Sequence, residues 1–146
     1  MQEELSASVA ILAELAIPFP GDAATLEALV RYVLMVERQT GDWEISIALV
    51  SDYALRRLHR DFLGLDTVTD IMTFPYGDGA DGGDIAISVD RAVEQAPEFG
   101  MTPWEELCFL AVHGVLHLSG WHDGDDDARR RMLARQTEII ESYRLA

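Results

Sequence analysis

Alternating apolar and polar positions predict the strands of this chain. Residues 44–50 alternate cleanly and residues 85–89 repeat the pattern, which is typical of strands with one buried face. Residues 70–74 form a shorter strand-like run that ends at Pro75, because proline cannot donate a hydrogen bond to a sheet. Residues 5–16 fit either a strand or a short helix, and we predict a strand over their first part.

Apolar residues at helical spacing predict five helices. Asp22 and Ser51 each stand directly before such a segment, where their side-chain oxygens can accept from free backbone N–H groups. Pro103 suits the first turn of the fourth helix, where its missing N–H group has no cost. The predicted helices span residues 23 to about 39, 52 to about 62, 90 to about 99, 103 to 118 and, after the acidic residues 125–127, on to about 143.

Strands and helices are mixed without strict alternation, which predicts an α+β fold. We expect residues 1–146 to form a single domain with a mixed sheet of about four strands and about five helices packed on it. The helix at 103–118 should be buried at the centre, because it is apolar nearly all round.

Residues 77–84 are rich in glycine and aspartate but lack the distal glutamate of a helix–loop–helix calcium site. We predict that they are a flexible connection between two strands.

Composition indicates the class of protein and its cellular compartment. The chain has 146 residues, of which 49% are hydrophobic and 25% charged, as in globular proteins. The single cysteine, Cys108, lies in an apolar helix, so we interpret it as a core residue in a reducing compartment. The apolar run 9–17 is too short to cross a bilayer and follows acidic residues instead of a basic leader. We therefore expect a cytoplasmic protein without a membrane partner.

The formal net charge is −15, and all eleven basic residues are arginines. Such a charge repels nucleic acid overall, so an RNA partner would need a local basic patch or a bound metal ion. Candidates for a patch are Arg56, Arg57 and Arg60, and separately residues 129–131 with Arg135. From charge alone we favour solvated helix faces that balance nearby acids.

Residues 113–123 read H-G-V-L-H-L-S-G-W-H-D and carry the candidate chemistry. His113 and His117 are four residues apart, which places both rings on one helix face within reach of one metal ion. Gly120 can turn the chain back toward that face, so the third ligand should come from this turn. The pattern predicts a zinc site with three protein ligands and an open position for water. A purely structural, hydrogen-bonded histidine cluster is the alternative.

The segments L-H-R-D-F-L-G-L-D-T-V-T-D-I-M-T-F (58–74) and G-D-I-A-I-S (83–88) precede the histidine motif, which Met132 and Glu138 follow. This order resembles the YbeY family of bacterial zinc-dependent endoribonucleases. The resemblance implies a compact α+β fold with one zinc ion. It also implies single-strand-specific cleavage in the 3′-end maturation of small-subunit (16S) rRNA and in ribosome quality control, with rRNA and the ribosomal small subunit or assembly factors as partners.

Two positions depart from the family pattern. The family motif usually ends G-Y-D-H, with the last histidine as third ligand, whereas G-W-H-D places Asp123 in that position. Aspartate is a legitimate zinc ligand, and we favour Asp123 over His122 because Gly120 sets the turn. The family usually carries an arginine at Leu63, thought to serve RNA handling. Unless another arginine replaces it, stabilisation of transition-state charge should fall.

The predicted reaction is metal-assisted phosphodiester hydrolysis through water bound at His113, His117 and Asp123. No general base is obvious, and the pairs Thr69–Asp70 and Gly83–Asp84 either shape the cleft or cap strands. A non-catalytic, zinc-containing ribosome-associated module is the main alternative.

A metzincin-like metalloprotease is a further alternative, because the histidine spacing resembles that zinc motif. Such peptidases place a catalytic glutamate directly after the first histidine. This chain has Gly114 there, so the base that would activate water against an amide is missing.

Overall fold

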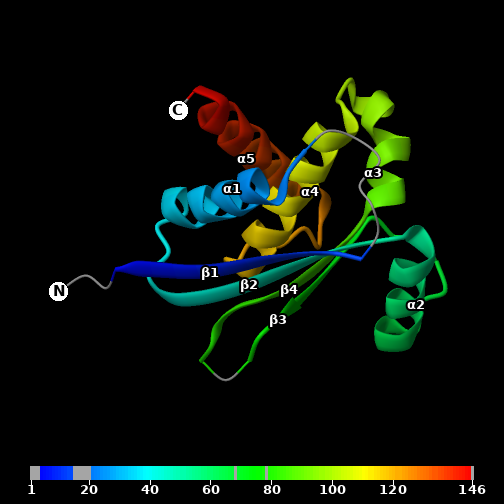
Figure 1. The fold of residues 1–146 in the computed structure, drawn as a ribbon, viewed down its shortest axis with the longest axis horizontal. Coiled ribbons are helices and arrows are strands. Elements are labelled where there is room, and N and C mark those ends of the chain that lie inside the picture. The colour runs from blue at the N-terminus through cyan, green and yellow to red at the C-terminus, as the bar shows by residue number, and fades with distance from the viewer. Residues whose placement is uncertain (1–3, 15–20, 68, 78, 146) are drawn as a thin grey trace.

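A computed structural model describes residues 4–14, 21–67, 69–77 and 79–145. Four strands form one sheet in the order β1-β2-β4-β3 (Figure 1). Strands β1, β2 and β4 run parallel, and β3 pairs antiparallel with β4 at one edge. The predicted mixed four-stranded sheet is therefore confirmed. The strands are β1 (Leu5–Ala13), β2 (Gly41–Val50), β3 (Ile71–Pro75) and β4 (Asp81–Ser88).

The five predicted helices are present within this described part of the chain. Their first residues agree closely with the sequence pattern, and Asp22 and Ser51 cap α1 and α2 as expected. The first helix ends earlier than predicted because Arg38 has a φ of 57°, outside the right-handed helical region. The helices are α1 (Ala23–Val36), α2 (Asp52–Leu63), α3 (Val89–Gln95), α4 (Pro103–Leu118) and α5 (Asp126–Leu145), with a 3₁₀ turn, η1 (Ala96–Phe99), after α3.

Two boundaries differ from the sequence prediction for identifiable reasons. The helix expected from 90 to about 99 changes to a 3₁₀ turn at Ala96, because Pro97 has no N–H group to continue the α-helical ladder. The loop expected over 77–84 is wrong at its end, since β4 already begins at Asp81. Residues 15, 16 and 78, which belong to predicted segments, lie outside the described residues.

Helices α1 and α4 pack on one face of the sheet, and α5 packs against α4 and α1 on the side away from the strands (Figure 1). Strand residues Ile47 and Ile87 on this face are fully buried against α4 residues such as Leu107 and Val115. Helix α2 packs on the opposite face through Leu55. The expected central buried helix is confirmed, because α4 contacts α1, α3, α5 and two strands.

Cys108 lies within this core, with 8% of its surface exposed. Burial raises the pKa of its thiol to about 12, so the reactive thiolate is disfavoured. This agrees with the interpretation of Cys108 as a packing residue. None of the helices in the described ranges is long and apolar enough to cross a bilayer.

Candidate metal centre

Helix α4 begins and ends at local sequence signals. Thr102 accepts a hydrogen bond from the Glu105 N–H (3.2 Å), and the Glu105 carboxylate accepts one from the Thr102 N–H (2.9 Å). At the other end Gly120 adopts a φ of 110°, and its N–H donates to the His117 carbonyl. The Trp121 N–H donates to the Leu116 carbonyl (3.0 Å), which completes a glycine-terminated helix end. The chain reverses there, as the sequence predicted.

The reversal brings Asp123 back to the histidine face of α4. The Nε2 atoms of His113 and His117 are 3.0 Å apart, and Asp123 Oδ2 lies 3.4 and 3.5 Å from them. A tetrahedral zinc ion with ligands at about 2.0–2.1 Å requires ligand atoms roughly 3.4 Å from one another. The three atoms are therefore spaced so that they could hold one metal ion.

Hydrogen bonds on the far side of each ring fix which nitrogen faces the cluster. The Gln136 amide donates to the Phe109 carbonyl (3.3 Å), so its oxygen is free to accept from His113 Nδ1 (2.8 Å). His117 Nδ1 likewise donates to the Trp121 carbonyl (3.1 Å). In the neutral form of each ring Nδ1 therefore carries the proton, and Nε2 presents a lone pair to the cluster, as in histidine–metal sites.

This pattern bears on the alternative of a purely structural cluster. Two Nε2 lone pairs and a carboxylate oxygen are all acceptors, so they cannot satisfy one another by hydrogen bonding. A cation placed between them converts this repulsion into attraction. The donor set of His113, His117 and Asp123 therefore fits a metal ion better than a hydrogen-bonded core network.

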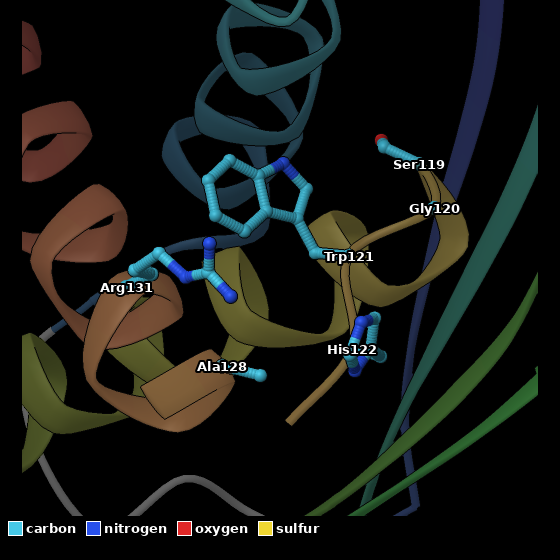
Figure 2. A pocket seen from close by; sticks show the side chains of 6 residues that line it. All are labelled: Ser119, Gly120, Trp121, His122, Ala128 and Arg131. Carbon is cyan, nitrogen blue, oxygen red and sulfur yellow. The ribbon is translucent and has the colours of Figure 1, made fainter. Parts of the chain in front are cut away.

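His122 lies outside this cluster. It is exposed and lines a neighbouring pocket of about 440 Å³ formed by the 119–122 turn and α5. Figure 2 shows Arg131 reaching from α5 toward Trp121 in this pocket. The indole N–H of Trp121 donates to Glu37 (2.6 Å), which anchors the turn on the end of α1. With that turn fixed, Asp123 and not His122 faces the two rings of α4.

Comparison with known proteins identifies the family. Residues 18–144 match the family described as endoribonuclease YbeY. The chain belongs to the YbeY family. It is 37% identical to endoribonuclease YbeY of Geobacillus thermodenitrificans (83% of this chain, 86% of the relative) and 30% identical to that of Clostridium botulinum strain Hall (82% and 87%). The solution structure of TM1509 from Thermotoga maritima superposes with a TM-score of 0.63 at 30% identity, covering 92% and 87% of the two chains.

The arginines that could have formed an RNA-binding patch in this YbeY protein are largely paired with acids. Arg56 contacts Asp66 at 2.9 Å. Arg131 contacts Asp127 at the same distance. These pairs support the interpretation of solvated, charge-balanced helix faces. At Leu63, where the family usually has arginine, the side chain is 60% exposed at the end of α2.

Gly114 packs directly against the sheet. A Cβ atom at this position would lie 2.9 Å from Ile85 Cδ1 and 3.1 Å from Ile71 Cδ1, closer than van der Waals contact allows. A side chain in its place would require the ends of both isoleucines to shift. The protease alternative is disfavoured because Gly114 supplies no catalytic carboxylate next to His113.

The two acidic pairs noted in the sequence have different surroundings. Asp70 accepts a hydrogen bond from Gln95 (3.1 Å) and lines a pocket that reaches His113. Asp84 accepts one from the Tyr76 hydroxyl (2.8 Å), which raises the pKa of that hydroxyl. Asp70 therefore helps to shape the cleft, and Asp84 joins the two neighbouring strands β3 and β4.

Sequence reasoning missed two buried polar residues beside the cluster, Gln136 and Glu106. Gln136 is 1% exposed and lies on the buried face of α5 with Met132 and Ile139. A polar residue at that helical spacing was the available signal. Glu106 is two turns before His113 on α4 and was hidden by the apolar residues that follow it.

Substituting Gln136 with leucine should weaken metal binding by about 10–100-fold, the usual effect of losing a residue that orients a metal-bound histidine. The substitution removes the acceptor of His113 Nδ1, so the ring loses its fixed tautomer and orientation. Isothermal titration of metal-free protein with Zn²⁺ measures the change. Arg130→Gln, an exposed substitution on the same helix, is the matched control, and equal affinities of the two variants would contradict this role.

Glu106 should make stability depend on pH. Burial raises the pKa of its carboxyl from 4.5 to about 7, Asp70 adds to the rise, and Gln95 partly opposes it. Between these pH values the folded protein holds a proton that the unfolded chain releases. The stability that this proton contributes is fully present below about pH 4.5 and is lost as the pH rises to about 7. Relative to Glu106→Gln, the wild type should lose roughly 3 kcal/mol across this window. Urea unfolding of both proteins at pH 4.5 and 8 measures this loss. An equal change in the free energy of unfolding of the two proteins between these pH values would contradict the prediction.

Proposed function

We propose that this chain is a zinc-dependent endoribonuclease whose ion is held by His113, His117 and Asp123. The observation that carries the proposal is the convergence of three acceptor atoms within 3.0–3.5 Å in a chain of the YbeY family. A bound zinc ion would lower the pKa of a water ligand and polarise a phosphate oxygen. His122 remains outside this proposed ligand set.

The protein's own groups would prepare this site for RNA. Gln136 and the Trp121 carbonyl hold the imidazoles in place before substrate arrives, so little reorganisation is needed during reaction. Asp123 has 39% of its side chain exposed, against 17% for His113, so the cluster opens to solvent on the Asp123 side. A phosphodiester could approach from that side despite the net charge of −15, because the ion supplies local positive charge.

The proposed substrate is single-stranded RNA at the 3′ end of small-subunit (16S) rRNA, with a further role in ribosome quality control. Support comes from the motif order that resembles the YbeY family and from relatives named endoribonuclease YbeY. We further propose that residues 1–146 act as a single domain in the cytoplasm, together with the ribosomal small subunit or its assembly factors. Leu63, in place of the usual family arginine, favours the non-catalytic ribosome-associated module as the second candidate.

The test compares metal-free and metal-loaded protein on a small-subunit rRNA 3′ fragment. We expect no cleavage by the chelated protein and restored cleavage after addition of one equivalent of Zn²⁺, with Mn²⁺ and Mg²⁺ as comparison ions. Double-stranded RNA of the same sequence should resist cleavage. Stoichiometric zinc binding without cleavage of any RNA would overturn the nuclease proposal and support the binding module.

A further inference from the structure

A second pocket, of about 540 Å³, lies beside α4 and reaches His113, one of the three residues of the metal cluster. His113 lines one part of it, and Asp70, Gln95 and Glu106 line another. Apolar side chains, among them Phe99 and Phe109, form much of the remaining wall. Pockets of this size, with apolar walls and a few convergent polar groups, are typical of sites for small organic groups.

Glu106 is the most unusual residue of this pocket. It is 2% exposed, and among the described residues its Oε2 atom has no hydrogen-bond partner. Leaving a buried acceptor unsatisfied is unfavourable, so the atom is suited to a ligand that brings a donor. The Gln95 amide donates to Asp70 (3.1 Å) and also acts on the Glu106 carboxyl, whose pKa it lowers, yet Oε2 is left without a partner in the described part of the chain.

Glu106 and His113 are separated by a length of helix that one nucleotide could span. The two residues Glu106 and His113 are seven positions apart on a helix, about 10 Å along its axis. A phosphate held near His113 would therefore place its own nucleoside in this pocket. The aromatic rings of Phe99 and Phe109 offer surfaces for a base, since base stacking on aromatic side chains is the usual mode of single-strand RNA recognition.

We propose that this pocket binds one guanine base beside the cleaved phosphodiester, and that the Glu106 carboxyl accepts hydrogen bonds from its N–H edge. Guanine offers two adjacent donors, N1–H and the N2 amino group, which match the two oxygens of the ionised Glu106 carboxylate, the form that predominates above its pKa of about 7. Uracil offers a single ring N–H, and adenine and cytosine offer only an amino group beside an acceptor. This inference rests on the proposed nuclease function and adds a base preference to it.

The first experiment measures nucleotide binding without any cleavage. Metal-free protein comprising residues 1–146 is titrated above pH 7 with guanosine, adenosine, cytidine and uridine 5′-monophosphates, and NMR shifts of the Gln95 side-chain amide report binding. We expect the guanine nucleotide to bind at least about tenfold more tightly than the others. Glu106→Gln should remove most of this difference, because an amide cannot accept two donors. Glu98→Gln, an exposed neighbour on η1, should keep it.

The second experiment uses zinc-loaded protein and a pool of single-stranded RNA with randomised sequence. Sequencing of the products should show guanine enriched at one position next to the cut, and Glu106→Gln should flatten that enrichment. Leu133→Trp, at a partly exposed wall of the pocket, should also reduce guanosine monophosphate binding and needs no rearrangement of the core. Thermal unfolding checks that each variant is folded.

The outcomes separate this inference from the proposed function. Equal binding of all four nucleotides, or an unchanged base profile in Glu106→Gln, would overturn the guanine pocket while leaving nuclease activity in place. Guanine-selective binding by a protein that cuts no RNA with any metal would instead overturn the nuclease proposal. Protection of the pocket by a ribosomal protein, with no nucleotide binding, would also refute the guanine assignment.

Discussion

His117→Ala should abolish metal-dependent RNA cleavage, with a loss on the order of a thousandfold or more. The substitution removes one of the three acceptor atoms that converge within 3.5 Å and leaves the remaining ring and Asp123 without tetrahedral coordination. The variant should also lose stoichiometric zinc. Elemental analysis of the purified protein and cleavage of a labelled rRNA 3′ fragment measure the two effects separately.

Two further variants test the ligand assignment itself. His122→Ala should retain both zinc and cleavage, because its side chain is exposed and outside the cluster. Asp123→His should also retain zinc, since imidazole is an equally good ligand, and it would reproduce the usual ligand set of the YbeY family. Loss of zinc in His122→Ala but not in Asp123→Ala would show that His122, and not Asp123, is the third ligand. Stoichiometric zinc in His117→Ala would contradict the proposed site as a whole.

Gly82→Ala should strongly destabilise the protein. A Cβ atom at position 82 would lie 1.9 Å from the backbone oxygen of Glu44 on β2, and the residue has a φ of 115°. Both overpacking against backbone and a strained φ oppose the new side chain. We expect the free energy of unfolding to fall by about 3–5 kcal/mol, measured by urea denaturation.

Gly79→Ala is the matched control for this effect. Gly79 also has a positive φ, of 79°, but no atom lies within 4 Å of the position its Cβ would take. Its cost should be limited to the left-handed backbone, about 1–2 kcal/mol. If Gly79→Ala and Gly82→Ala destabilise the protein equally, close packing between β2 and β4 is not the reason for glycine at position 82.

Elements with strong local signals were predictable from the chain. The bounds of α4 agree with prediction at both ends, because Pro103 and Gly120 mark them by backbone chemistry that acts within a few residues. The alternation of residues 44–50 likewise predicted most of β2. The start of β4 was missed because Gly82 and its neighbours resemble a loop in composition, and pairing with β2 overrides that local preference.

The candidate site likewise has one part that the sequence predicts and another that only the tertiary structure determines. The spacing of His113 and His117 is enough to put both rings on one side of a helix, since that depends only on helical geometry. Gly120 already favours Asp123 over His122 in the sequence, but the hydrogen bond that holds this turn in place joins Trp121 to Glu37, a residue 84 positions away. Gln136 and the pocket around Glu106 likewise come from helices that meet only when the chain packs. Local periodicity describes one element at a time, whereas these contacts arise from the way elements distant in sequence share one core.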